Sequence, residues 1–179
     1  MKIFSIMIIV FNFQLLIAQA GISTNLKISN MTKQILNDLL IQNQITNGTA
    51  LEQVSNENIE MRLNDGTATV GFIYRHIGET IHLLSTFLGE QTTIRNTTMG
   101  QQDIGQGKTL TESQQLVRSG FVLLQNIIDK NSETWWLEEI DTPFFGKVSR
   151  LRLFCHILYH NSHHAGQISL TISKGSQKH

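Results

Sequence analysis

Residues 147–175 read KVSRLRLFCHILYHNSHHAGQISLTISKG. Apolar residues recur at helical spacing from about Lys147 to Ser173, and Gly175 supplies a stop, which together predict one long helix. Apolar residues lie on nearly all sides of this helix, which is typical of a helix buried inside a bundle. They are Val148, Leu151, Leu153, Phe154, Ile157, Leu158, Ile168 and Ile172. Histidines within such a buried helix are therefore unexpected and need a structural or functional explanation.

Four histidines interrupt this apolar pattern, at positions 156, 160, 163 and 164. At about 100° per residue, His156, His160 and His164 are each displaced by about 40° from the one before, so they share one stripe. Two histidines four residues apart on a helix can place two imidazole nitrogens on one metal ion. No Glu stands between them as in the zinc-protease motif, so that motif itself is absent.

Three segments upstream also show the spacing of amphipathic helices. The second covers about residues 67–88 and stops at Gly89. The third begins at Thr111, where the pattern from Thr111 to Gln114 offers a capping box. The first covers about residues 25–44 and carries an apolar stripe made of Ile28, Met31, Ile35 and Leu39.

The polar segments between these helices predict turns and one long connection. Asn47-Gly48 and Asn64-Asp65-Gly66 are turn signals that follow the first helix. Residues 89–110 are rich in Gly, Thr and Gln and are long for a bundle loop, which predicts a crossover or a functional loop. Four long amphipathic helices predict an all-α fold, namely a four-helix bundle.

The second helix adds one histidine to those of the last helix. Mainly apolar residues lie within about 60° of His76 on a helical wheel, which places His76 at the centre of the inward stripe. His82 lies about 120° away and is expected to be exposed. Three protein nitrogens with an open fourth position are the pattern of a catalytic divalent site. On spacing alone, a hydrogen-bonded polar layer in the core and an oligomer interface remain alternatives.

Composition narrows the class of protein. The chain has 179 residues, which suits one domain, and 40% of them are hydrophobic, which supports a sizeable core. Fourteen basic residues balance fourteen acidic ones, so no basic face is available for a phosphate backbone and we expect no nucleic-acid partner. The single Cys155 excludes an intramolecular disulfide framework.

Residues 1–20 have the organisation of a secretory signal peptide. Lys2 provides a positive start, an apolar run follows, and Ala18-Gln19-Ala20 fits the cleavage rule for small residues. The apolar run is short for a membrane span, which needs roughly 20 residues, although an uncleaved anchor is the alternative. We therefore expect a mature domain at 21–179 that is secreted or periplasmic, without stable membrane insertion.

The segment His160-Asn161-Ser162-His163-His164-Ala165-Gly166-Gln167 resembles the HxxHHxGQ signature of the DinB-like (YfiT-like) metalloenzymes. The segment His76-Ile77-Gly78-Glu79 resembles the context of their first ligand, and the resemblance covers about residues 25–175. It implies an up-up-down-down four-helix bundle with a long connection between the second and third helices. It also implies a divalent ion, zinc or nickel, on His76, His160 and His164. His156 then becomes a neighbour on the stripe and a rival ligand. Many relatives have Arg or Lys where this chain has Ala165.

Two polar residues near the histidines are candidates for supporting roles. Glu79, close to His76 on the helix, could orient a ligand as a hydrogen-bond acceptor or act as the catalytic base. A solvated helix carboxylate is the alternative for Glu79. Gln167 lies close to the histidine stripe and could hydrogen-bond a ligand or the substrate, or serve helix packing beside Gly166.

The resemblance implies either metal-dependent hydrolysis or transfer and isomerisation with a low-molecular-weight thiol. Export favours the first, because thiol cofactors are concentrated in the cytoplasm. We expect an exported hydrolase for an unidentified small molecule. The alternative is a non-catalytic bundle that binds a metal or small ligand, or forms a homodimer. The enzyme predicts a solvent-reachable cavity beside the ion, whereas a binding protein permits a sealed site.

Overall fold

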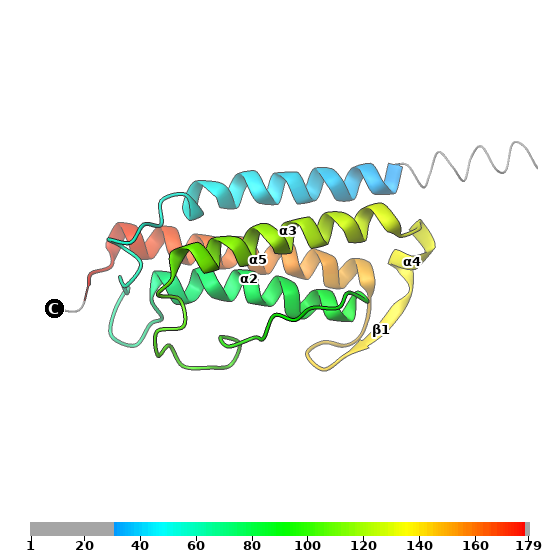
Figure 1. Ribbon diagram of the computed structural model, residues 1–179. Helices are drawn as coiled ribbons and strands as arrows, with labels where there is room; N and C mark the ends of the chain where they lie inside the picture. The colour runs from blue at the N-terminus through cyan, green and yellow to red at the C-terminus, as the bar shows by residue number, and fades with distance from the viewer. Residues whose placement is uncertain (1–30, 178–179) are drawn as a thin grey trace, which may run out of the picture.

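The computed structural model describes residues 31–177, so the predicted signal peptide at 1–20 lies outside the described residues. Four long helices form a bundle, and a short helix and a β-hairpin close one end of it (Figure 1). The predicted all-α four-helix bundle is confirmed. The elements are an N-terminal helix (residues 31–51), α2 (Val70–Phe87), α3 (Leu110–Lys130), α4 (Glu133–Leu137), β1 (Glu139–Thr142), β2 (Gly146–Ser149) and α5 (Arg150–Lys174).

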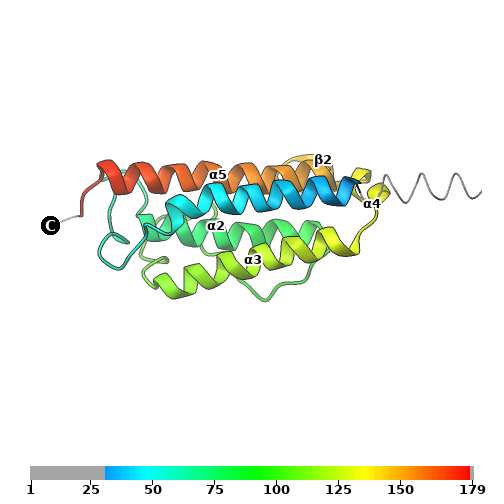
Figure 2. The ribbon, with the colours of Figure 1, turned by 90° about the horizontal axis from the view of Figure 1, so that it is seen from above.

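The directions of the four long helices correct one part of the expected topology. The N-terminal helix runs antiparallel to α3, because Lys33 donates to the Asp129 carbonyl and the Gln125 amide donates to Asn37. The long helices do form two parallel pairs, but these are α2 with α3 and the N-terminal helix with α5 (Figures 1 and 2). The order along the chain is therefore up-down-down-up, not up-up-down-down. The long segment between α2 and α3 is the crossover that makes these two helices parallel.

The N-terminal helix presents a different face to the core than the predicted stripe. Met31, Ile35 and Leu39 are exposed, whereas Leu36 and Leu40 are buried. This helix lies along α5 in Figure 2 and along α3 in Figure 1, and its side chains hydrogen-bond to both. Apolar residues occupy two of its faces, so the sequence pattern did not decide which face is covered.

The predicted turn at Asn47-Gly48 is wrong, because both residues lie inside the N-terminal helix. Asn47 is buried and its amide donates to the Asn43 side chain, whose own amide donates to the Leu158 carbonyl on α5. Tertiary hydrogen bonds thus keep a turn-forming pair helical. The turn at residues 64–66 is confirmed.

The ends of α2 and α3 show which of the predicted capping residues begin or end a helix. The Thr69 hydroxyl caps α2 by accepting from the Phe72 amide, and Gly89 follows the helix at φ +87°, a left-handed conformation that suits glycine. Helix α3 begins at Leu110 with Thr109 as its N-cap, and that side chain makes no capping hydrogen bond. The capping box predicted from Thr111 is therefore wrong, because Thr111 already lies within the helix.

A β-hairpin precedes α5, which the sequence pattern did not predict. Strands β1 and β2 pair antiparallel over four residues each, too short for alternation to be recognised. Gly146 allows the tight turn at φ +63°. Because the hairpin includes residues 147–149, α5 begins at Arg150 and not at the predicted Lys147. The Ser149 hydroxyl caps the helix, and the predicted stop at Gly175 is confirmed.

The core lies between the four helices and extends under α4, whose Trp136 is buried with its ring 5.3 Å from that of Phe154 on α5. This packing fixes α5 in the bundle, and α5 carries most of the histidines. Within residues 31–177, no helix combines the length and apolar character needed to cross a membrane.

Candidate metal centre

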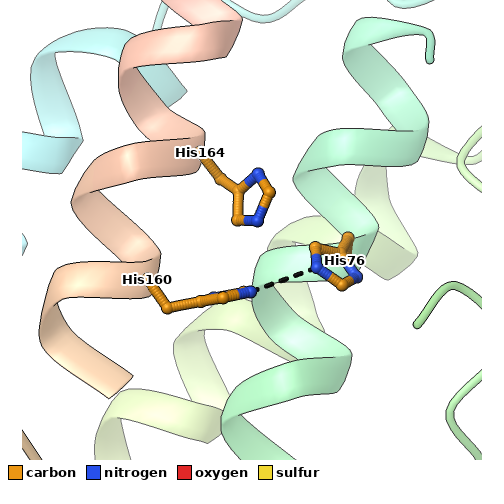
Figure 3. A group of neighbouring side chains, drawn as sticks. All are labelled: His76, His160 and His164. Carbon is orange, nitrogen blue, oxygen red and sulfur yellow. Dashed lines mark hydrogen bonds between the residues drawn. The ribbon is translucent and has the colours of Figure 1, made fainter. Parts of the chain in front are cut away.

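Three histidines from two helices meet inside the bundle (Figure 3). His76 comes from α2, and His160 and His164 come from successive turns of α5. The Nε2 atoms of His76 and His160 lie 3.1 Å apart, and one nitrogen of each ring lies within 4.8 Å of the others. Nitrogens this close can coordinate one ion at the usual distance of about 2.0–2.1 Å with little rearrangement. The structure therefore brings together the three predicted ligands.

The second ring nitrogen of His76 is held by a buried hydrogen-bond chain. Its Nδ1 lies 3.0 Å from the Thr98 hydroxyl, which in turn donates to Oε2 of Glu79 at 2.9 Å. The single hydroxyl proton is used toward Glu79, so the Thr98 oxygen accepts from Nδ1–H. That tautomer leaves a lone pair on Nε2, the atom facing the other two rings. Metal-binding histidines are commonly oriented in this way.

The two cluster histidines of α5, His160 and His164, differ in the hydrogen bonds made by their Nδ1 atoms. His164 donates from Nδ1 to Oε1 of Gln167 at 2.7 Å, which also leaves its Nε2 free for an ion. The Gln167 amide contacts His163 at 3.1 Å. Nδ1 of His160 is buried and has no hydrogen-bond partner among the described residues. Its Nε2 lies 3.1 Å from Nε2 of His76, whose lone pair accepts the His160 proton, so Nε2 would bind an ion only with that proton moved to Nδ1.

The environment keeps the three rings neutral. Burial lowers the pKa of His76 to about 4, with a contribution from the neighbouring His164. Burial and the adjacent histidines lower the pKa of His160 to about 3, and burial also lowers the pKa of His164. Neutral imidazoles have lone pairs, so protons compete weakly with a metal ion for this site at neutral pH.

Glu79 lies behind His76 rather than facing the other histidines. Its side chain is fully buried and accepts hydrogen bonds from Arg75 at 2.6 Å, from the Thr97 backbone and hydroxyl, and from Thr98. Burial raises its pKa, but these hydrogen bonds outweigh burial and lower it overall. A carboxylate with all its partners inside the protein fits the predicted orienting role. Glu79 is not among the residues that line the pocket beside the histidines, and its role as catalytic base stays a prediction.

Two further histidines of the described residues, His156 and His82, lie outside the cluster. His156 contacts the Phe145 ring and is 6.2 Å from the His160 ring, so the structure does not group it with the other three. His82 is buried, with Nε2 within hydrogen-bonding distance of the Leu116 carbonyl and the Ser119 hydroxyl on α3, which corrects the prediction that it is exposed. The parallel packing of α3 against α2 covers that face of the helix.

Sequence reasoning missed Thr98, which lies in the long connection between α2 and α3. This connection is anchored at its far end, where Asp103 accepts from the Thr69 amide at 2.8 Å and pairs with Arg62. The length and polarity of residues 89–110 signalled a functional loop, but no local pattern could single out one threonine. Its role follows from the crossover bringing it against α2.

A pocket of about 410 Å³ opens beside the cluster. His76 and His164 contribute to its lining, together with Thr98 and Gln167. Leu63 and Leu170 also line it and are 37% and 50% exposed, so the pocket reaches solvent. The histidine cluster is thus accessible to a small molecule.

Removing the Thr98 hydroxyl should weaken the site without altering its shape. In Thr98→Val, the His76 ring loses its principal acceptor, since the Thr80 hydroxyl is farther away at 3.5 Å. We expect zinc affinity to fall ~10-fold, the lower range for such outer hydrogen bonds. Competition with a chromophoric chelator measures this, and Thr98→Ser should retain wild-type affinity. Equal affinities in all three proteins would contradict the assigned role.

The chain is similar to one protein family and to several proteins of known structure. A family model described as DinB family matches residues 28–175. YfiT from Bacillus subtilis, described as a probable metal-dependent hydrolase with an unusual four-helix bundle topology, is 16% identical, with a TM-score of 0.61 over 81% of this chain and 89% of YfiT. A DinB-like protein from Bacillus cereus is 15% identical, with a TM-score of 0.61 over 78% and 94% of the two chains. The DinB-like protein YjoA from Bacillus subtilis is 19% identical, with a TM-score of 0.57 over 78% and 90%. No curated protein matches the chain.

Proposed function

The chain belongs to the DinB family, and from that membership we propose that it is an exported metal-dependent hydrolase with zinc or nickel on His76, His160 and His164. Export rests on the signal-like residues 1–20. The description of YfiT as a probable metal-dependent hydrolase supports the reaction class, and the histidine cluster supports the ion.

The donor set fits a borderline divalent ion. Imidazole nitrogens suit zinc and nickel, whereas magnesium and calcium prefer oxygen ligands. The hydrogen bonds to Nδ1 of His76 and of His164 leave Nε2 of both rings for coordination. Among the described residues, no carboxylate belongs to the three-histidine group, so the candidate ligands themselves carry no negative charge.

A bound divalent ion supplies Lewis acidity toward a carbonyl and lowers the pKa of water. The residues of the chain prepare the site for that chemistry. Glu79 and Thr98 hold the proton on Nδ1 of His76 and fix its ring, and Gln167 does the same for His164. The pocket walls position the substrate beside the histidines. Uncharged ligands leave the full charge of the ion available to the reacting group.

The pocket is the observation that carries the enzymatic proposal. A non-catalytic metal site is typically closed, with protein filling every coordination position. Here a cavity of about 410 Å³ reaches His76 and His164. Three histidines would hold the ion and would leave room on it for a substrate or water. This arrangement favours an enzyme over a sealed binding site.

Metal removal tests the proposal directly. The mature protein is stripped with a chelator, reloaded with zinc or nickel, and tested on a panel of uncharged esters and amides. We expect hydrolysis by the loaded protein, background rates in the stripped protein, and recovery on reloading. Background rates in His164→Ala after the same metal treatment would assign the activity to this site. Hydrolysis that persists unchanged in the stripped protein would refute metal dependence.

A further inference from the structure

The pocket beside the histidines has a strongly apolar wall. Among the described residues, the lining contains no Asp, Glu, Lys or Arg side chain, and its titratable groups are His76 and His164. A pocket of about 410 Å³ is within the range that small-molecule ligands occupy. Its apolar side chains come from α2, from the segment before α2, and from α5. They are Leu63, Ala68, Phe72, Ile73 and Leu170.

The polar side chains in the lining already have partners within the protein. The Thr67 hydroxyl donates to the Asn64 carbonyl, and the Thr171 hydroxyl donates to the Gln167 carbonyl. The Thr98 hydroxyl is used between Glu79 and His76. Both ends of the Gln167 side-chain amide contact histidines. A charged group entering the pocket would therefore lose water without gaining equivalent hydrogen bonds.

The side chain of Arg62 is also paired within the protein. Arg62 precedes the lining residue Leu63, but its guanidinium pairs with Asp103 at 2.9 Å and donates to the Thr67 carbonyl. Ala165 is buried and adds no charge. Apart from an ion held by the histidines, the described residues around the pocket thus offer no free cation to an anionic ligand.

We propose that this pocket selects a neutral, mainly apolar small molecule whose single polar functional group faces His76 and His164. Only the orientation of the ligand, with its polar group toward the histidines, rests on the proposed function. Its selectivity comes from the pocket wall, where apolar contact is favourable and charge is not compensated. A low-molecular-weight thiol that carries several carboxylates is correspondingly expected to bind this pocket poorly, because its charges would not be compensated.

Two hydroxamates of equal chain length test this selectivity. Octanohydroxamate ends in a methyl group and suberic monohydroxamate ends in a carboxylate, while both carry the same metal-binding head. Calorimetric titration is performed on the zinc-loaded and on the chelator-stripped protein. We expect octanohydroxamate to bind at least ~10-fold more tightly in both forms, because its apolar tail is buried without loss of charge hydration. Equal or tighter binding of suberic monohydroxamate, or no binding of octanohydroxamate, would overturn the proposal.

A charge added at the pocket mouth gives a matched control. Leu170 lines the pocket and is 50% exposed, whereas Val122 on α3 is 60% exposed and does not line it. Leu170→Lys should reduce the preference for the methyl tail severalfold, and Val122→Lys should leave it unchanged. An unchanged preference in Leu170→Lys would place the tail elsewhere and overturn the inference.

The two forms of the protein separate this inference from the proposed function. If zinc fails to bind but the methyl-tail preference persists in the stripped protein, the metalloenzyme proposal fails and the apolar selectivity stands. If zinc binds and the preference is absent, the selectivity alone is refuted.

Discussion

Replacing His160 or His164 by alanine is expected to reduce zinc affinity by at least ~100-fold, because losing a ligand costs more than losing an outer hydrogen bond. Each substitution removes one of three nitrogens that lie within 4.8 Å of one another. The two that remain cannot replace it without moving a helix. Elemental analysis after desalting should show about one zinc per wild-type chain and almost none in either variant.

His156→Ala is the matched control for this prediction. His156 lies on the same stripe of α5, one turn before His160, but contacts Phe145 instead of the cluster. Zinc content should stay at the wild-type level in this variant. Full zinc occupancy in His164→Ala, or loss of zinc in His156→Ala, would show that the ligands have been assigned incorrectly.

Gly107→Ala should be the most destabilising glycine substitution at the crossover. Gly107 is buried against the first turn of α2, and an added Cβ would overlap the backbone carbonyl of Gly71. Backbone atoms cannot turn aside as a side chain can, so the end of the crossover must move. We expect a loss of about 3 kcal/mol in the free energy of unfolding, the upper range for overpacking. Urea denaturation followed by circular dichroism measures this loss.

Gly166→Ala provides the contrasting case. Gly166 lies on the exposed surface of α5, and an added Cβ meets no atom within 4 Å. Alanine should therefore stabilise the protein by about 0.5–1 kcal/mol through its helix propensity. A similar loss of stability in both variants would argue against the close approach at Gly107. The open surroundings of Gly166 also argue against close helix packing at that position.

The sequence predicted the long helices well but located some of their exposed and buried faces incorrectly. Helix α2 was predicted from its pattern to within a few residues, because its Thr69 cap and Gly89 stop are local signals. His82 was expected to be exposed, yet α3 covers it. A helical wheel gives the angle between two side chains but not how many neighbours surround the helix.

Local sequence by itself determined the helices, the spacing of the histidines and the family signature, since hydrophobic periodicity and caps act over a few residues. Tertiary structure alone decided that α2 and α3 run parallel and that the crossover brings Thr98 against His76. It also decided that the described residues lining the pocket include no Asp, Glu, Lys or Arg. These features depend on contacts between residues that are distant in the chain. Such contacts produce no periodic pattern in the sequence.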